Sequence, residues 1–183
     1  MRVERLRAKY QIDVKYTHFP LHPDTPSEGL TLEQLFAGRN IDVLAAKAHR
    51  VQLMADEGLP YGDRTMTYNS RLAQELAEWA VTQRGGDAIH DALFRAYFVA
   101  GANIAGVDML VKIAEELGLP SDKAREVLES RRFKDTVDAD WRRCKERGVT
   151  GVPTFVVGDR AVVGAQPYEV LEALVRDAGA ELR

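Results

Sequence analysis

The sequence predicts an α/β protein whose small sheet is interrupted by a long helical insertion. Three features of the 183 residues support this prediction. Residues 12–19 alternate between apolar and polar side chains with a period close to two, as a half-buried strand does. Residues 154–163 contain two more short β-branched runs around a Gly-Asp turn. Between these regions, apolar residues recur at helical spacing from residue 30 to about residue 148.

The N-terminal part is expected to pass from a short basic helix into a strand and then a loop. The helix would occupy residues 3–10. The strand would run from Ile12 to Phe19, because β-branched and aromatic residues alternate there. Three prolines follow and mark a loop that ends at Gly29, since proline removes a ladder donor and stiffens the backbone.

The helical insertion is expected to bury one apolar stripe from each of its helices. The first stripe consists of Leu44, Ala48, Val51 and Ala55, and its helix would end at Gly58. Later stripes are Leu72, Leu76, Trp79 and Ala80; Ile89, Leu93, Ala96 and Tyr97; and Val137, Trp141 and Cys144.

The C-terminal part is predicted to be a hairpin followed by one helix. Its strands would be residues 154–157 and 161–163, and Pro167 would open the closing helix. The resulting division places residues 1–29 and 149–183 in an α/β part and residues 30–148 in the helical insertion.

Composition excludes several classes of protein. The net charge is −3, and no long run of either sign occurs, which argues against a general nucleic-acid binder. No apolar run reaches the roughly 20 residues of a membrane span. The N-terminal residues carry charges without an apolar core behind them, which is not the pattern of a secretory signal. We therefore expect a cytoplasmic protein with no membrane partner.

Cysteine and histidine usage limits the chemistry further. Cys144 is the single cysteine, so these residues contain no disulfide, no Cys-x-x-Cys motif and no cysteine zinc cluster. The four histidines have no metal-ligand spacing, and no phosphate-binding or nucleophile-elbow motif occurs. We expect no metal site, and the sequence names no catalytic residue.

One segment is chemically suggestive. Residues 148–155, Gly-Val-Thr-Gly-Val-Pro-Thr-Phe, lead into the predicted hairpin. The two glycines allow the backbone to approach another chain closely, and Pro153 at the start of a strand cannot donate to a ladder. From these properties alone, a functional loop and a simple strand entry remain equally good interpretations.

This segment, together with Gly-Ala-Gln-Pro at residues 164–167, resembles the C-terminal half of DsbA-family thioredoxin-fold proteins. The resemblance is strongest to the FrnE-like branch, which is related to the 2-hydroxychromene-2-carboxylate isomerases. It extends over most of the chain through residues 18–24, 66–73 and 94–98. It implies a thioredoxin-like sheet, a cis bond between Val152 and Pro153, and pairing of the Val152 backbone with a thiol substrate.

The chain departs from the family pattern at its N-terminus. It begins inside what would be the first helix, so the first strand and the Cys-x-x-Cys motif are missing from these residues. Disulfide exchange needs a stabilised thiolate and a second, resolving thiol. Cys144 is expected on the apolar face of a helix near its negative end, where burial and the helix dipole both disfavour the thiolate. We expect Cys144 to be buried and inert.

Three functional hypotheses remain open. The first is a thiol–disulfide oxidoreductase whose active form carries an upstream Cys-x-x-Cys, while this chain is redox-inactive. The second is a glutathione-dependent isomerase or kappa-class transferase, in which glutathione supplies the thiol. The third is a non-catalytic binding protein, which uses an open sheet edge for a partner or a second copy. The substrate would be a protein or small molecule bearing a thiol or disulfide.

The missing first strand also has three structural outcomes. We expect one of the following: that the natural protein starts further upstream, that the strand at Ile12 to Phe19 pairs directly with the hairpin, or that a partner such as an identical subunit fills the gap.

Overall fold

The computed structural model describes residues 2–38 and 41–183. These residues form two compact units, one of residues 2–21 and 140–183 and the other of residues 22–38 and 41–139. The boundary falls within helix α8 (Lys134–Glu146). Among the described residues, no helix has the length and apolar character needed to cross a bilayer.

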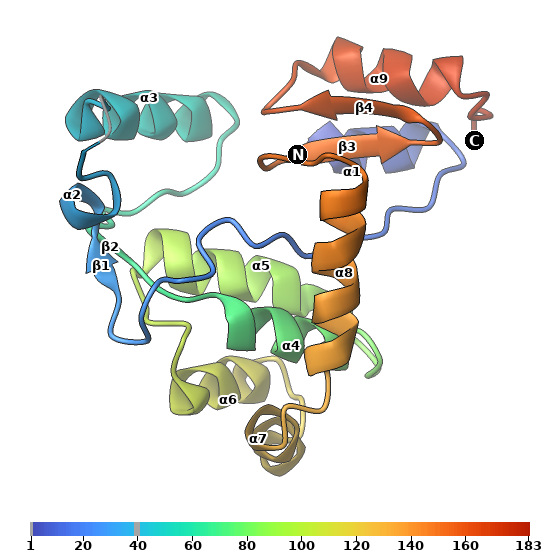
Figure 1. The fold of residues 1–183 in the computed structure, drawn as a ribbon. Helices are drawn as coiled ribbons and strands as arrows, with labels where there is room; N and C mark the ends of the chain where they lie inside the picture. The colour runs from blue at the N-terminus through green and yellow to red at the C-terminus, as the bar shows by residue number, and fades with distance from the viewer. Residues whose placement is uncertain (1, 39–40) are drawn as a thin grey trace. The chain divides into compact units, whose positions relative to one another are not determined.

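The first unit is built around a two-stranded hairpin. Strand β3 (Thr154–Val157) pairs antiparallel with β4 (Arg160–Val163) across the predicted Gly-Asp turn. Helices α1 (Arg2–Lys9) and α9 (Tyr168–Asp177) pack with this hairpin (Figure 1). Their core consists of Leu6, Tyr10, Leu171 and Val175, with Phe155, Val157 and Val162 of the hairpin packed against them.

The predicted strand from Ile12 to Phe19 is wrong. This segment has no regular secondary structure, and Val14 and Tyr16 are exposed. The chain forms only an isolated antiparallel bridge nearby, between Tyr10 and Leu182. An alternating pattern does not make a strand without a neighbouring strand, because the backbone groups of a strand find their partners across a ladder.

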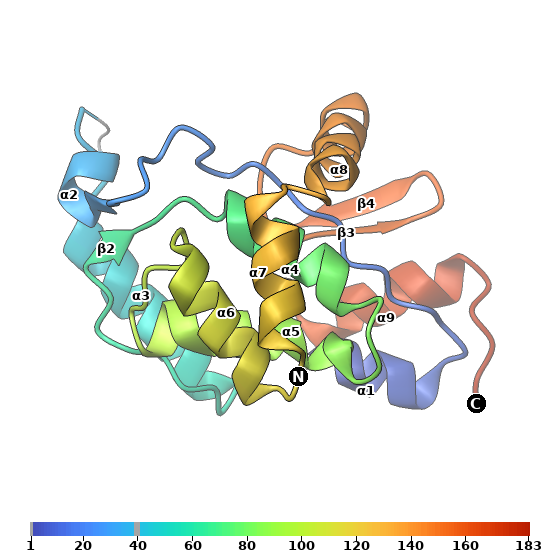
Figure 2. The same ribbon diagram turned by 90° about the horizontal axis from the view of Figure 1, so that it is seen from below.

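The second unit contains most of the helices. Its shorter elements are β1 (Leu30–Thr31), α2 (Leu32–Leu35), β2 (Met66–Thr67), the 3₁₀ turn η1 (Gly86–Ala88) and the π-helix η2 (Arg95–Val99). Its longer helices are α3 (Val43–Asp56), α4 (Arg71–Ala80), α5 (Ile89–Phe94), α6 (Val107–Glu116) and α7 (Ser121–Glu129). Helices α4, α6 and α7 pack together around the core (Figure 2).

The expectation of an entirely helical region from residue 30 to residue 148 is also incorrect. Strands β1 and β2 form a small antiparallel sheet, with Leu30 opposite Thr67 and Thr31 opposite Met66. Two-residue strands give too little periodicity to be read from the sequence.

The apolar stripes of α3 and α4 differ in how far they are buried. In α4 most of the predicted stripe is buried, with Leu76 and Ala80 fully buried and Trp79 5% exposed, while Leu72 is half-buried. In α3 no residue is buried, and Leu44 and Val51 are 79% and 44% exposed. The prediction of a buried α3 stripe is therefore wrong, because periodicity defines an apolar face but does not supply the surface that covers it.

A buried carboxylate organises the second unit. Glu75 is fully buried in α4 and accepts hydrogen bonds from Arg71 at 2.7 Å and from Arg131 at 2.7 and 2.8 Å. Arg131 follows α7 and has a left-handed φ of 54°, which is unfavourable for a residue with a side chain. Burial raises the pKa of the Glu75 carboxyl, but the hydrogen bonds from Arg131 and then Arg71 outweigh burial and lower that pKa below its ordinary value.

Replacing Glu75 with glutamine should lower the free energy of unfolding by about 2 kcal/mol at neutral pH, because two guanidinium groups lose the negative charge and one of the two buried acceptor oxygens. Chemical denaturation followed by circular dichroism measures this difference. Glu129→Gln is the matched control, since Glu129 forms an exposed pair with Arg125 and its loss should change stability by less than about 0.5 kcal/mol.

The Glu75 contribution should also depend on pH. The folded-state pKa lies below the unfolded one, so the stabilisation is complete above the unfolded pKa and is lost as pH falls through the folded pKa. The difference between wild type and Glu75→Gln should therefore shrink on acidification below about pH 4.5. A difference that stays constant down to strongly acidic pH would contradict a paired carboxylate at this position.

Candidate functional site

The suggestive segment is an exposed loop between α8 and β3. It begins where Gly148 adopts a left-handed φ of 65° and Val149 N–H donates to Cys144 O at 2.9 Å. It ends where the Thr154 hydroxyl donates to Gly151 O at 2.6 Å. These local hydrogen bonds fix the direction in which the chain leaves the helix and enters β3.

The peptide bond between Val152 and Pro153 is cis, and both residues are exposed. Pro153 O accepts a hydrogen bond of 2.7 Å from Gly164 N–H, just beyond β4. The segment after Gly164 is held in turn by Arg2 of α1, whose guanidinium donates to Ala165 O at 3.2 Å and Gln166 O at 2.5 Å. Residues from both ends of the chain thus fix the position of the proline.

The backbone beside this proline is available for binding. Val152 is 50% exposed, and its N–H and C=O have no hydrogen-bond partner among the described residues. Since Gly164 bonds to Pro153 and antiparallel pairing alternates, the backbone groups of Thr154 and Val156 face the edge of β3 that is opposite β4. No strand pairs with that edge within residues 2–38 and 41–183. The arrangement can bind an extended chain through its backbone.

Cys144 has the buried environment that the sequence predicts. It is 7% exposed, and its thiol donates to His18 O at 3.5 Å. Burial raises the pKa of the thiol, and the nearby charge of Asp140 adds to this, while Arg143 acts in the opposite direction. The thiolate needed for attack on a disulfide is therefore disfavoured.

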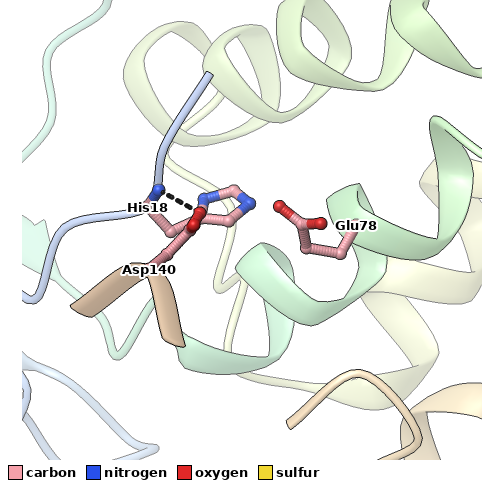
Figure 3. A group of neighbouring side chains, drawn as sticks. All are labelled: His18, Glu78 and Asp140. Atoms are coloured by element: carbon pink, nitrogen blue, oxygen red, sulfur yellow. Dashed lines mark hydrogen bonds between the residues drawn. The ribbon is translucent and has the colours of Figure 1, made fainter. Parts of the chain in front are cut away.

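Asp140 also holds the His18 backbone. Its carboxylate accepts a hydrogen bond of 2.9 Å from His18 N–H (Figure 3). Asp140 is buried, and the Arg143 guanidinium lies 3.8 Å from its carboxylate. Glu78, the third side chain drawn, lies on α4 in the other compact unit. Within their own unit, His18 and Asp140 offer two ligand atoms, fewer than the three or four protein ligands of an ordinary zinc site, so this pair alone does not form one.

Comparison with known proteins decides the family. The family model described as the DSBA-like thioredoxin domain matches residues 1–176. The chain belongs to this family.

Two individual proteins are similar to this chain over different lengths. The uncharacterized protein YwbO of Bacillus subtilis (strain 168) is 33% identical over 107 residues, which cover 58% of this chain and 54% of YwbO. The match thus spans about half of that relative. A crystal structure described as a "probable DsbA oxidoreductase" from Streptomyces coelicolor is 29% identical, with a TM-score of 0.86, covering 97% of this chain and 82% of that one.

A third similarity concerns the fold alone. A 2-hydroxychromene-2-carboxylate isomerase structure is 20% identical, with a TM-score of 0.68, and the alignment covers 97% of this chain and 85% of the isomerase. The DSBA-like fold is therefore shared with a protein of a different named activity, as is common for widespread folds.

The sequence predicts Val152 and Pro153 as binding residues, which stays a prediction, and it gives no sign of the residues that hold this loop in place. Arg2 and the backbone of residues 164–166 position the loop, and the bond from His18 to Asp140 joins positions 122 residues apart. Such long-range backbone contacts carry no local signal, because a main-chain carbonyl or N–H is the same in every residue type.

Cys144 should react about 100-fold more slowly with iodoacetamide in the native protein than in concentrated guanidinium chloride, because the buried thiol ionises poorly and is shielded. Quenched samples analysed by mass spectrometry measure the two rates near pH 8. Alkylation of the native protein at the rate of an unfolded cysteine would show that Cys144 is accessible and would remove the argument for inertness.

Proposed function

We propose that this chain provides the substrate-binding part of a DsbA-like thiol–disulfide oxidoreductase and that these 183 residues do not exchange disulfides by themselves. The observation that carries the proposal is the exposed Val152, whose backbone groups have no partner among the described residues and adjoin the cis-Pro153 of a DSBA-like domain. The substrate would be a protein or a small molecule that contains a thiol or a disulfide. The name of the similar Streptomyces coelicolor structure supports an oxidoreductase role.

Chemistry supports the lack of exchange. In disulfide exchange, one thiolate attacks a substrate sulfur and releases the other sulfur as a thiolate, and a second thiol then resolves the mixed disulfide. These residues contain one thiol, and it is buried and hydrogen-bonded to His18 O. Cys144 is therefore suited to packing rather than to attack.

Geometry supports binding of an extended segment. The Val152 N–H and C=O can pair with a substrate backbone on either side of its sulfur, and the free edge of β3 continues the same row of donors and acceptors. Backbone pairing of this kind gives affinity with little dependence on side-chain identity, which suits a protein that handles different substrates.

A cytoplasmic location is part of this proposal. One unpaired cysteine is the form that a structural thiol takes in a reducing compartment, where disulfides are rare.

The purified chain should not accelerate insulin reduction by dithiothreitol above the uncatalysed rate, because no attacking and resolving thiol pair is present. Turbidity of the released insulin chains gives the rate. Cys144→Ser should behave in the same way. Turnover by the wild type that disappears in Cys144→Ser would overturn the inactivity proposed for this chain.

Binding can be tested separately from turnover. A fluorescent ten-residue peptide with an S-methylated cysteine is a suitable probe, since it cannot undergo exchange. Val152→Pro removes the N–H donor and should weaken binding about tenfold. Val152→Ala keeps both backbone groups and should bind within about twofold of the wild type. Fluorescence anisotropy measures both affinities, and equal weakening by the two variants would argue against backbone recognition at Val152.

A glutathione-dependent isomerase or transferase is the second candidate. The observation that favours it is the single, buried cysteine, because glutathione would supply the reactive thiol and no protein cysteine would be needed. The fold similarity to the isomerase is compatible with this role. Saturable binding of glutathione by calorimetry, weakened by Val152→Pro, would favour this candidate, whereas no binding at millimolar glutathione would exclude it.

A further inference from the structure

Helix α3 presents an apolar face that no side chain of the described structure buries. Leu44, Ala48, Val51 and Ala55 are all exposed, although they form the most regular apolar stripe of this helix. With 100° between successive residues, the four positions lie within an arc of about 60° and extend over about 17 Å. A continuous exposed apolar stripe of this kind is typical of an interaction surface.

The stripe is complementary to itself. Leu44 and Ala55 are equally distant in sequence from the midpoint between residues 49 and 50, and Ala48 and Val51 are also equally distant from it. A two-fold axis through this midpoint, perpendicular to an antiparallel helix pair, places Leu44 against Ala55 of the other copy and Ala48 against Val51. Each large side chain then faces a small one, which allows close packing of two identical helices.

The pattern extends past both ends of the helix. Ile41 precedes the N-cap Asp42 and is 42% exposed, and Gly58 follows the C-cap Glu57. Ile41 and Gly58 have the same midpoint as the two pairs within the helix. The alternation of large with small residues therefore continues in the same register.

The charges next to the stripe do not oppose this contact. Lys47 is paired with Asp63, and the Gln52 amide donates to Asp56 at 2.7 Å. Lys47, a charged side chain beside the stripe, is thus already paired within its own chain, and the Gln52 amide is also engaged. The four residues of the stripe carry no charge themselves, so the stripe brings no charge of its own into the contact.

We propose that α3 is a self-association surface, on which a second copy of this chain packs its own α3 in antiparallel orientation. The self-complementary order of large and small residues selects a second copy over an unrelated partner, because a heterologous partner would impose no such symmetry. The contact differs from the open edge of β3 that the sequence suggested for an oligomer.

The expected affinity of this dimer follows from the surface area that its formation would bury. Two stripes of this length, with their flanking side chains, would bury about 1,000 Å² in total, which is at the lower end of specific interfaces. The dimer should therefore be weak, with a Kd on the order of 10–100 μM. Sedimentation equilibrium of the full chain should show the mass rising from 20.4 kDa toward twice that value with concentration.

A charge placed on the stripe tests the surface. Ala48→Glu should raise the Kd at least tenfold, since it places two carboxylates near the two-fold axis. His49→Glu is the matched control, because His49 is the next exposed residue of the same helix but lies off the stripe. The dimer Kd of this variant should stay within about twofold of the wild-type value. Circular dichroism verifies that both variants keep their helices. Equal effects of the two variants would overturn the assignment.

Exchange of the central pair tests the register. Ala48→Val should weaken the dimer about fivefold by crowding two valines, and Val51→Ala about tenfold by leaving a gap. The double variant A48V/V51A restores one valine opposite one alanine and should return the Kd to within about twofold of the wild type. An apolar patch without register would instead bind more tightly after Ala48→Val.

Two results would overturn the proposal. One is a mass that stays at 20.4 kDa at every concentration up to about 500 μM. The other is a double variant as weak as the two single variants combined, which would mean that a contact with different geometry holds the copies together.

Discussion

The candidate site depends on the β3–β4 hairpin. The backbone N–H and C=O groups of a strand point to its two edges, and a group is free to bind another chain only where no neighbouring strand pairs with it. One edge of β3 is paired with β4, and this pairing ends in the bond from Gly164 to Pro153. The opposite edge has no strand beside it among the described residues. The same hydrogen-bond rule therefore fixes the position of the cis-proline loop and leaves the Val152 backbone without a hydrogen-bond partner among the described residues.

In the helical unit, the burial of one charged side chain constrains how the helices pack. A fully buried glutamate is unfavourable unless its oxygens are bound by cations or other donors. Arg71 and Arg131 satisfy Glu75, and the left-handed backbone at Arg131 directs this guanidinium to it. The network links α4 to the turn after α7, so packing of the helices and pairing of the charges depend on each other.

Helices α3 and α4 show that having an apolar face and burying that face are two different properties. Both have an apolar stripe at helical spacing, and the sequence correctly predicts both helices. Most of the α4 stripe is buried because α6 and α7 cover it, whereas the α3 stripe remains exposed. Such a stripe indicates that a helix has an apolar face to cover, and the covering surface can belong to another molecule.

The sequence by itself determined the features that depend on neighbouring residues. The β3–β4 hairpin, its Gly-Asp turn, most helices and the burial of Cys144 all follow from local patterns and from a family resemblance carried by short motifs. The tertiary structure alone decided that the segment from Ile12 to Phe19 is not a strand and that Arg2 and residues 164–166 hold Pro153. The physical reason is that these features depend on partners distant in the chain, and a residue's own chemistry does not specify which distant backbone group will lie beside it.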